Sequence, residues 1–161
     1  MNVPPDVLIH KALQWLAHAG EDLTMARHTL KLKSSCPYRL IAYHAQQCAE
    51  KSLKAFLVLY GVDFPFTHDL FRLVRLCPKS ISWMEDAVEA ASLTPYAAAT
   101  RYPGGELRIT REKAVASVKT AARLRSLIRA DIARRVGEQQ PTAITPRQTR
   151  TTRSEGRQTA R

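Results

Sequence analysis

Three long segments repeat apolar residues at spacings of three and four, the period of an α-helix with one buried face. They cover about residues 7–30, 37–60 and 113–135. Strong helix formers dominate this part of the chain, and the 161 residues include only six glycines. Shorter apolar patterns predict helices over about 67–77 and 83–93. We therefore expect an all-α fold, an up-and-down helical bundle of four to five helices.

Local residues predict where several of these helices begin and end. Pro37 suits the first turn of the second helix, and Gly61 suits its C-terminal stop. Thr67 is the expected N-cap of the short third helix, with Asp69 in its first turn. Thr110 is the expected N-cap of the last helix.

The composition changes after residue 135. Residues 136–161 are rich in Thr, Arg, Gln and Pro and nearly lack large apolar side chains. Such a segment buries too little surface to offset the entropy of ordering it. We expect one domain over 1–135 and a disordered basic tail over 136–161. The five arginines of the tail are either a nucleic-acid-contacting arm or part of an extension without function.

The expected bundle is basic. Residues 1–135 hold 20 Lys and Arg against 12 Asp and Glu, a net charge of +8 out of +11 for the chain. This charge favours a polyanionic partner such as a nucleotide, RNA or an acidic protein. The alternative is that it serves only solubility.

Other compositional features predict the location and exclude some kinds of site. No segment approaches the roughly 20 apolar residues of a membrane span, and the start lacks the pattern of a secretory signal. We expect a cytoplasmic protein without membrane association. The three cysteines lack metal-ligand spacing, so the sequence predicts no metal site, and it suggests no cofactor.

The second predicted helix carries an unusual polar face. Wound at 3.6 residues per turn, its polar residues fall on adjacent rows and form a strip of hydroxyl, imidazole, amide, carboxylate and ammonium groups. The members of this polar strip are Tyr43, His44, Gln47, Glu50, Lys51 and Lys54. We treat them as candidate ligand-binding residues. The alternative is a solvated face with a Glu50–Lys54 ion pair.

The same segment resembles a known signature. Residues 43–57 read YHAQQCAEKSLKAFL, which is similar to the second-helix pattern of HEPN domains, aromatic-His-x-Gln-Gln-small-small-Glu-Lys-x-Leu-Lys-Ala. Three further pieces occur in the expected order, at residues 15–26, 67–70 and 101–103. The resemblance covers roughly residues 8–135.

The resemblance implies a bundle of four to five helices, often a homodimer. Some HEPN members are metal-independent ribonucleases that act as toxins, and many are encoded beside a minimal nucleotidyltransferase. Other members look like nucleotide binders. For this chain it implies a toxin–antitoxin setting, with a nucleotidyltransferase antitoxin as a possible partner.

The sequence departs from the HEPN pattern at one point that bears on ribonuclease activity. Ribonuclease members carry Arg-x4–6-His, usually at the start of the last helix, where Arg stabilises phosphate charge and His performs acid–base work. Here the last histidine in the chain is His68, so the last helix lacks the motif. One match occurs in the second helix, from Arg39 to His44. The catalytic candidates of an atypical ribonuclease are therefore Arg39, His44 and His68.

Two short segments outside the second helix supply further ligand-binding candidates. His68 and Asp69 follow that helix, and Arg101 and Tyr102 precede the last one. We expect His68 to reach the polar strip and Arg101 to contact a phosphate held against its lysines. The structural alternatives are a helix cap at residues 67–69 and a packing loop at 101–103.

These observations predict a HEPN-like module that binds a nucleotide or RNA without the standard nuclease motif. An atypical ribonuclease and a dimeric scaffold without a ligand are the alternatives. The prediction requires the polar strip and residues 101–103 to converge on one anion-sized recess.

Overall fold

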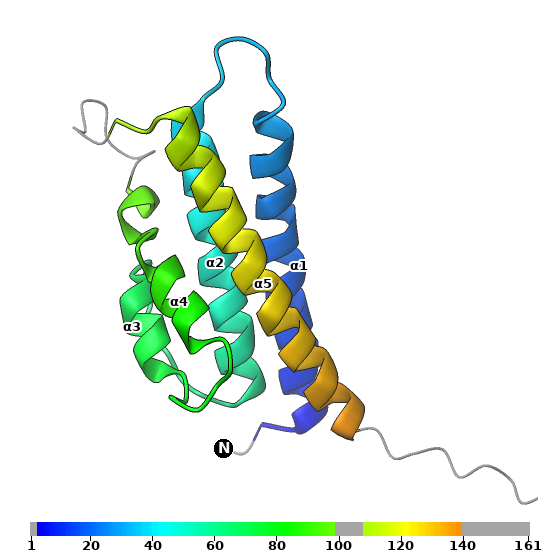
Figure 1. Cartoon of the computed structure of the whole chain (residues 1–161). Helices are drawn as coiled ribbons and strands as arrows, with labels where there is room; N and C mark the ends of the chain where they lie inside the picture. Colours follow the sequence, from blue (N-terminus) through cyan, green and yellow to red (C-terminus); the bar gives the residue numbers. More distant parts are fainter. Residues whose placement is uncertain (1–2, 99–107, 140–161) are drawn as a thin grey trace, which may run out of the picture.

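The computed structural model describes residues 3–98 and 108–139 of the chain. The helices are α1 (Pro5–Thr29), α2 (Tyr38–Leu59), α3 (Leu70–Leu76), α4 (Met84–Ala91) and α5 (Arg111–Gln139), with a 3-10 turn, η1 (Thr94–Ala97). No strand occurs in these ranges. The predicted all-α bundle is therefore confirmed (Figure 1). No described helix is both long and apolar enough to cross a membrane.

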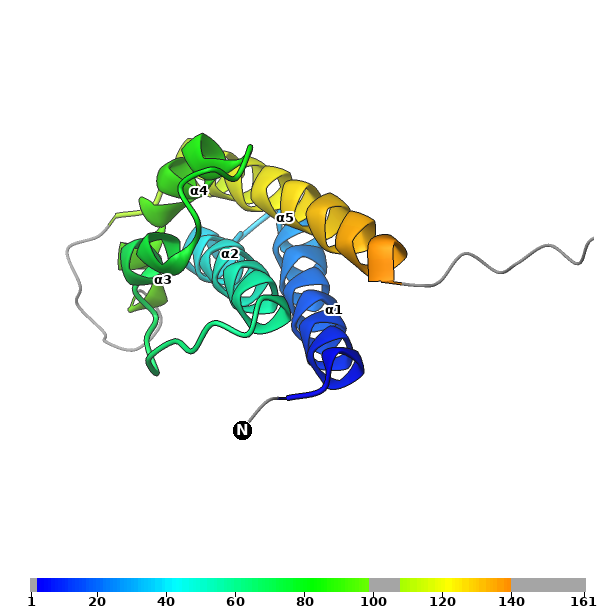
Figure 2. The same cartoon turned by 90° about the horizontal axis from the view of Figure 1, so that it is seen from below.

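Helix α2 lies at the centre of the bundle (Figure 2). It packs against α1 along their length, α5 crosses the pair, and α3 and η1 contact its other side. Fifteen of its 22 residues are buried. The predicted apolar positions of α2, from Ile41 to Leu57, are fully buried. Polar side chains on α2 are therefore enclosed unless they lie at the edge of a neighbouring helix.

Small side chains bring the three long helices together. Ala12, Ala19 and Ala26 of α1 face the core at helical spacing and are fully buried. Cys48 is a core residue of α2, as expected, and desolvation by burial raises the pKa of its thiol to about 12. Cys48 therefore behaves as a small apolar side chain at neutral pH.

Gly20 in the middle of α1 is explained by its neighbour on α5. A Cβ at this position would lie 2.7 Å from Nη2 of Arg125. The same nitrogen donates a hydrogen bond to the carbonyl oxygen of Leu16 at 3.2 Å. The missing side chain therefore leaves room for a guanidinium group between α1 and α5.

The end of α2 follows its prediction. Gly61 has φ +64°, in the left-handed region that favours glycine. The Gly61 amide donates to the carbonyl of Val58, and the Val62 amide donates to that of Leu57 at 2.9 Å. These two bonds are a Schellman motif, which satisfies carbonyls at the helix end.

The start of α3 differs from its prediction. Asp69, not Thr67, is the N-cap, and its Oδ1 accepts the Phe71 amide at 3.0 Å. Thr67 instead accepts the Asp69 amide on its hydroxyl. The predicted cap two residues earlier is wrong because Thr67 orders the turn before the helix.

The last helix begins as expected and ends later than the composition suggested. Thr110 accepts the Lys113 amide on its hydroxyl at 3.3 Å. Helix α5 continues to Gln139, so residues 136–139 are helical. The rest of the predicted tail lies outside the described residues.

Two glycines predict opposite effects of the same substitution. Gly61→Ala forces an L-residue into the left-handed region and should lower the free energy of unfolding by about 1 kcal/mol. Gly137→Ala meets no atom within 4 Å, in a helix, and should be neutral or stabilising by up to about 1 kcal/mol. Urea denaturation of both variants checks this. Changes of the same sign would contradict the helix end described here.

Candidate functional site

The polar strip of α2 faces α1 on one side and the segment before α3 on the other. Each neighbour brings one hydrogen-bonding side chain to it, Asp22 from α1 and His68 from the 62–69 segment. The contacts form two clusters, each built around one buried carboxylate.

The first cluster is centred on Asp22, which is only 8% exposed. Its Oδ1 lies 2.8 Å from Nδ1 of His44, and its Oδ2 accepts from Nζ of Lys51 at 2.5 Å. Because an ionised carboxylate only accepts, Nδ1 of His44 carries the proton, and Nε2 is directed away from Asp22. The His44 and Lys51 side chains are 26% and 25% exposed. Asp22 thus holds two basic groups at the edge of the α1–α2 contact.

The second cluster is centred on Glu50, which is 3% exposed. Its carboxylate accepts from Nζ of Lys54 at 2.7 Å and from Nε2 of Gln46 at 3.0 Å. Nδ1 of His68 lies 3.1 Å from Oε2 of Glu50. Gln46 Nε2 also donates to the His68 carbonyl at 3.1 Å, which fixes the backbone before α3. Gln47 completes the network by donating to Oε1 of Gln46 at 2.7 Å.

Lys54 is enclosed by more than its carboxylate. Its Nζ lies 5.4 Å from the ring centre of Trp15 and 5.7 Å from that of Phe64. Its side chain is 8% exposed. An ammonium group with an ion-pair partner and two aromatic faces is fully committed within the protein. Lys54 therefore anchors the 62–69 segment to α2.

The interpretation of the strip as a solvated face is wrong. Gln47, Glu50 and Lys54 are buried, because α1 and the 62–69 segment cover them. The Glu50–Lys54 pair does form, as a buried ion pair. Such a pair is costly to break by removing one partner, unlike an exposed pair.

The structure separates the sequence candidates. His44, Lys51 and His68 keep part of their surface exposed, and Tyr43 is half-buried with its ring edge-on to His44 at 5.4 Å. His68 reaches the strip, as expected, but at Glu50.

The remaining candidates lie elsewhere. Asp69 caps α3. Arg39 is exposed in the first turn of α2, while His44 faces Asp22 on α1. Arg101 and Tyr102 lie outside the described residues, so their convergence with the strip stays a prediction.

Sequence reasoning missed Asp22 as a site residue. The signal was present, because Asp22 lies between Ala19 and Ala26 in the apolar stripe of α1. A carboxylate at a core-facing position requires a cationic or hydrogen-bonding partner nearby. Those partners are on α2, more than 20 positions away.

Comparison with known proteins agrees with this architecture. Residues 12–131 match the HEPN domain family. The chain belongs to the HEPN family.

Two solved structures resemble this HEPN chain. TT1696 from Thermus thermophilus is 28% identical, with a TM-score of 0.65, over 74% of this chain and 97% of that one. ST0689, an archaeal HEPN homologue, is 23% identical, with a TM-score of 0.59, over 76% of this chain and 98% of that one. The second likeness supports the fold alone. No curated protein matches the sequence.

The chemistry of this HEPN site is that of fixed hydrogen-bond donors. With both imidazoles neutral, the charges of the two carboxylates and two lysines cancel. Within the described ranges, no three His, Cys, Asp or Glu side chains are placed to hold a metal ion.

The Glu50 cluster predicts a large loss of stability on removal of one charge. Glu50→Gln leaves the buried Lys54 ammonium without its carboxylate, and the free energy of unfolding should fall by about 3 kcal/mol. Adding Lys54→Met should restore a large part of this loss.

The matched control is Glu138→Gln. Glu138 is 58% exposed and paired with Arg134 at the same i,i+4 spacing, so its loss should cost less than about 0.5 kcal/mol. Urea denaturation measures all three variants. Equal effects of the two Glu→Gln changes would show that the Glu50 cluster is not buried.

Proposed function

We propose that this HEPN chain is a binding module that holds a phosphate of a nucleotide or of RNA at the exposed edge of the polar strip. The proposal rests on the contacts of three basic side chains, His44, Lys51 and His68. Each of these basic groups contacts a buried carboxylate and keeps part of its own surface exposed.

Fixed donors suit a phosphate better than mobile ones. A lysine free in solvent loses side-chain entropy when it orders around a ligand. Lys51 is already oriented by Asp22, and two of its three ammonium hydrogens remain beyond that contact. Charge-assisted bonds to phosphate oxygens are the strong class of hydrogen bond. Tyr43 lies beside His44 and is only half-buried, so part of its side chain is available to a base or a ribose.

The histidine content of the chain supports binding rather than standard ribonuclease chemistry. All five histidines precede residue 69, so no histidine follows Arg108 or Arg111 at the start of α5. The acid–base partner that ribonuclease members of the family use there is missing from the sequence.

We further propose that the chain acts in the cytoplasm beside a minimal nucleotidyltransferase, in a toxin–antitoxin-type system, and forms a homodimer. The family resemblance and the charge of +8 over residues 1–135 support an acidic or nucleotide-bearing partner. Light scattering of the purified chain tests the homodimer. Co-expression with an adjacent nucleotidyltransferase gene tests the complex.

One observation favours a second candidate, an atypical ribonuclease. The contact between Asp22 and Nδ1 of His44 is the arrangement by which a carboxylate orients a general base, with Nε2 directed away from the carboxylate. RNA cleavage in EDTA, compared among the native chain, His44→Ala and His68→Ala, tests it. Cleavage that survives both substitutions rules out these histidines.

The binding role predicts a ligand-dependent rise in melting temperature. Nucleotide at about 100 times its Kd should add about 2.7 kcal/mol to the stability of the native chain. Lys51→Ala removes a fixed donor and should shrink the ligand-induced rise, measured against the unliganded melting temperature of the same variant. Lys119→Ala removes the same charge from an exposed position on α5 and should leave the rise unchanged. No rise with any nucleotide or short RNA, or equal losses in both variants, would contradict the proposal.

A further inference from the structure

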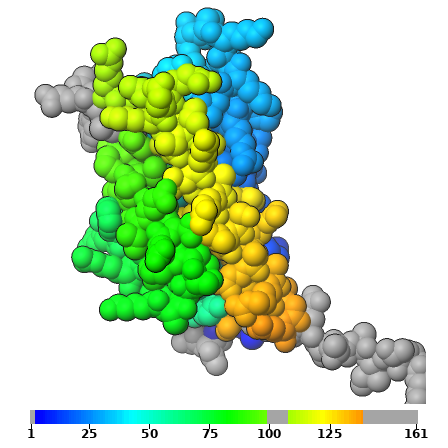
Figure 3. All heavy atoms as spheres, in the orientation of Figure 1, coloured from blue at the N-terminus to red at the C-terminus, as the bar shows by residue number. Residues whose placement is uncertain are grey.

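A cavity of about 570 Å3 lies between the C-terminal half of α5, the end of α2 and the 78–83 segment. Phe56 lines it and follows Lys54 by two positions, about 200° around the helix. The cavity is therefore on the other side of α2 from the polar strip. In the space-filling view, atoms of the green 78–98 region and of the orange end of α5 meet along this side of the molecule (Figure 3).

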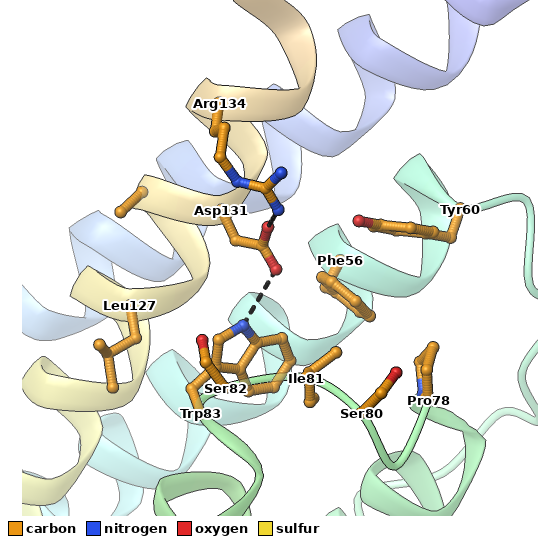
Figure 4. A pocket seen from close by; sticks show the side chains of 11 residues that line it. Phe56, Tyr60, Pro78, Ser80, Ile81, Ser82, Trp83, Leu127, Asp131 and Arg134 are labelled. Atoms are coloured by element: carbon orange, nitrogen blue, oxygen red, sulfur yellow. Dashed lines mark hydrogen bonds and ion pairs between the residues drawn. The ribbon is translucent and has the colours of Figure 1, made fainter. Parts of the chain in front are cut away.

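The inner wall of the cavity is aromatic. Phe56 is fully buried. Its ring centre lies 4.8 Å from that of Trp83, in an edge-on contact, and 4.5 Å from that of Tyr60, in a tilted contact. The Arg135 guanidinium lies 4.2 Å from the Tyr60 ring centre, and therefore helps to hold that ring in place. The three rings point into one space in the close-up view (Figure 4). Phe56 and Trp83 are buried, whereas Tyr60 keeps part of its ring surface exposed, so Tyr60 supplies the ring that a flat molecule can contact and the other two hold it rigid.

The polar wall is centred on Asp131. Its Oδ2 accepts the indole Nε1 hydrogen of Trp83 at 3.1 Å, and its Oδ1 accepts from Nη2 of Arg134 at 2.5 Å (Figure 4). A carboxylate has about four acceptor positions, so two remain. The hydrogen bond from Trp83 holds the Asp131 carboxylate in place. The exposed hydroxyl residues Ser80 and Ser82 stand at the rim.

We propose that this cavity binds a planar aromatic molecule that carries N–H donors, the chemistry shared by nucleobases and aromatic amines. Its volume lies within the range of about 300–1,000 Å3 typical of ligand pockets. A mostly apolar lining with a few placed polar groups is also typical of small-molecule sites. The partly exposed Tyr60 ring selects a flat ring that can stack on it. The Asp131 carboxylate selects a donor and disfavours a ring that only accepts hydrogen bonds. This site does not rest on the proposed phosphate site, because α2 separates the two.

Trp83 makes binding measurable. The chain has two tryptophans, so Trp15→Phe leaves Trp83 as the single tryptophan, which is excited selectively at the red edge of the protein absorption band. Titrations with 9-methyladenine and with aniline represent a nucleobase and an aromatic amine, and 9-methylpurine is a matched ring without N–H donors. We expect saturable quenching by at least one donor ligand, with Kd at least tenfold lower than for 9-methylpurine. Whichever of the two donor ligands binds more tightly shows whether the cavity prefers a nucleobase or an aromatic amine. Absence of saturation by both at about 1 mM, or equal affinity for 9-methylpurine, overturns the proposal.

Two alanines of α5 supply a matched pair of blocking variants. Ala130 lines the cavity, whereas Ala133 is also exposed on the same helix and does not line it. Ala130→Leu should weaken the tighter donor ligand at least tenfold, and Ala133→Leu should leave its Kd unchanged. Leucine is well tolerated in helices, and circular dichroism confirms that both variants fold. Unchanged binding by Ala130→Leu, or equal losses in both variants, places the ligand elsewhere and overturns the assignment.

Discussion

The arrangement of this molecule depends on the burial of two carboxylates, Asp22 and Glu50. Taking a charge out of water is costly, and the cost is offset only when partners are held in good geometry. Asp22 contacts an imidazole and an ammonium group of α2, and Glu50 contacts an ammonium group, an amide and an imidazole. These contacts join α1, α2 and the segment before α3 at one face.

The same contacts restrict how the elements pack. The two partners of Asp22 on α2 are seven positions apart, about 10 Å along the axis. Sliding α1 by one turn, about 5.4 Å, would separate Asp22 from at least one of them. Packing of alanines alone would specify the position of α1 along α2 less strictly, because after a shift of one turn one alanine would occupy the place of another. We infer that the carboxylates set the helix register and, through it, the positions of His44, Lys51 and His68.

The sequence predicts the helices well and the site only in part. Periodic apolar residues identify the long helices, and Gly61 and Thr110 mark their ends, because these signals are local. The spacing of polar residues on α2 identifies the strip. Its burial is not predictable from α2, since Asp22 comes from another helix and the 62–69 segment covers Lys54. The cavity beside Trp83 is harder still to predict from the sequence, because three separate segments form it.

Nitrogen-15 NMR of the histidine side chains tests directly whether each buried carboxylate accepts the Nδ1 hydrogen of an imidazole. With the imidazoles uncharged, His44 and His68 should both show a protonated Nδ1 and an unprotonated Nε2. The exposed His10 and His18 serve as references in the same spectrum. Predominant protonation of Nε2 in His44 and His68 would contradict this arrangement, because neither Nδ1 could then donate to its carboxylate.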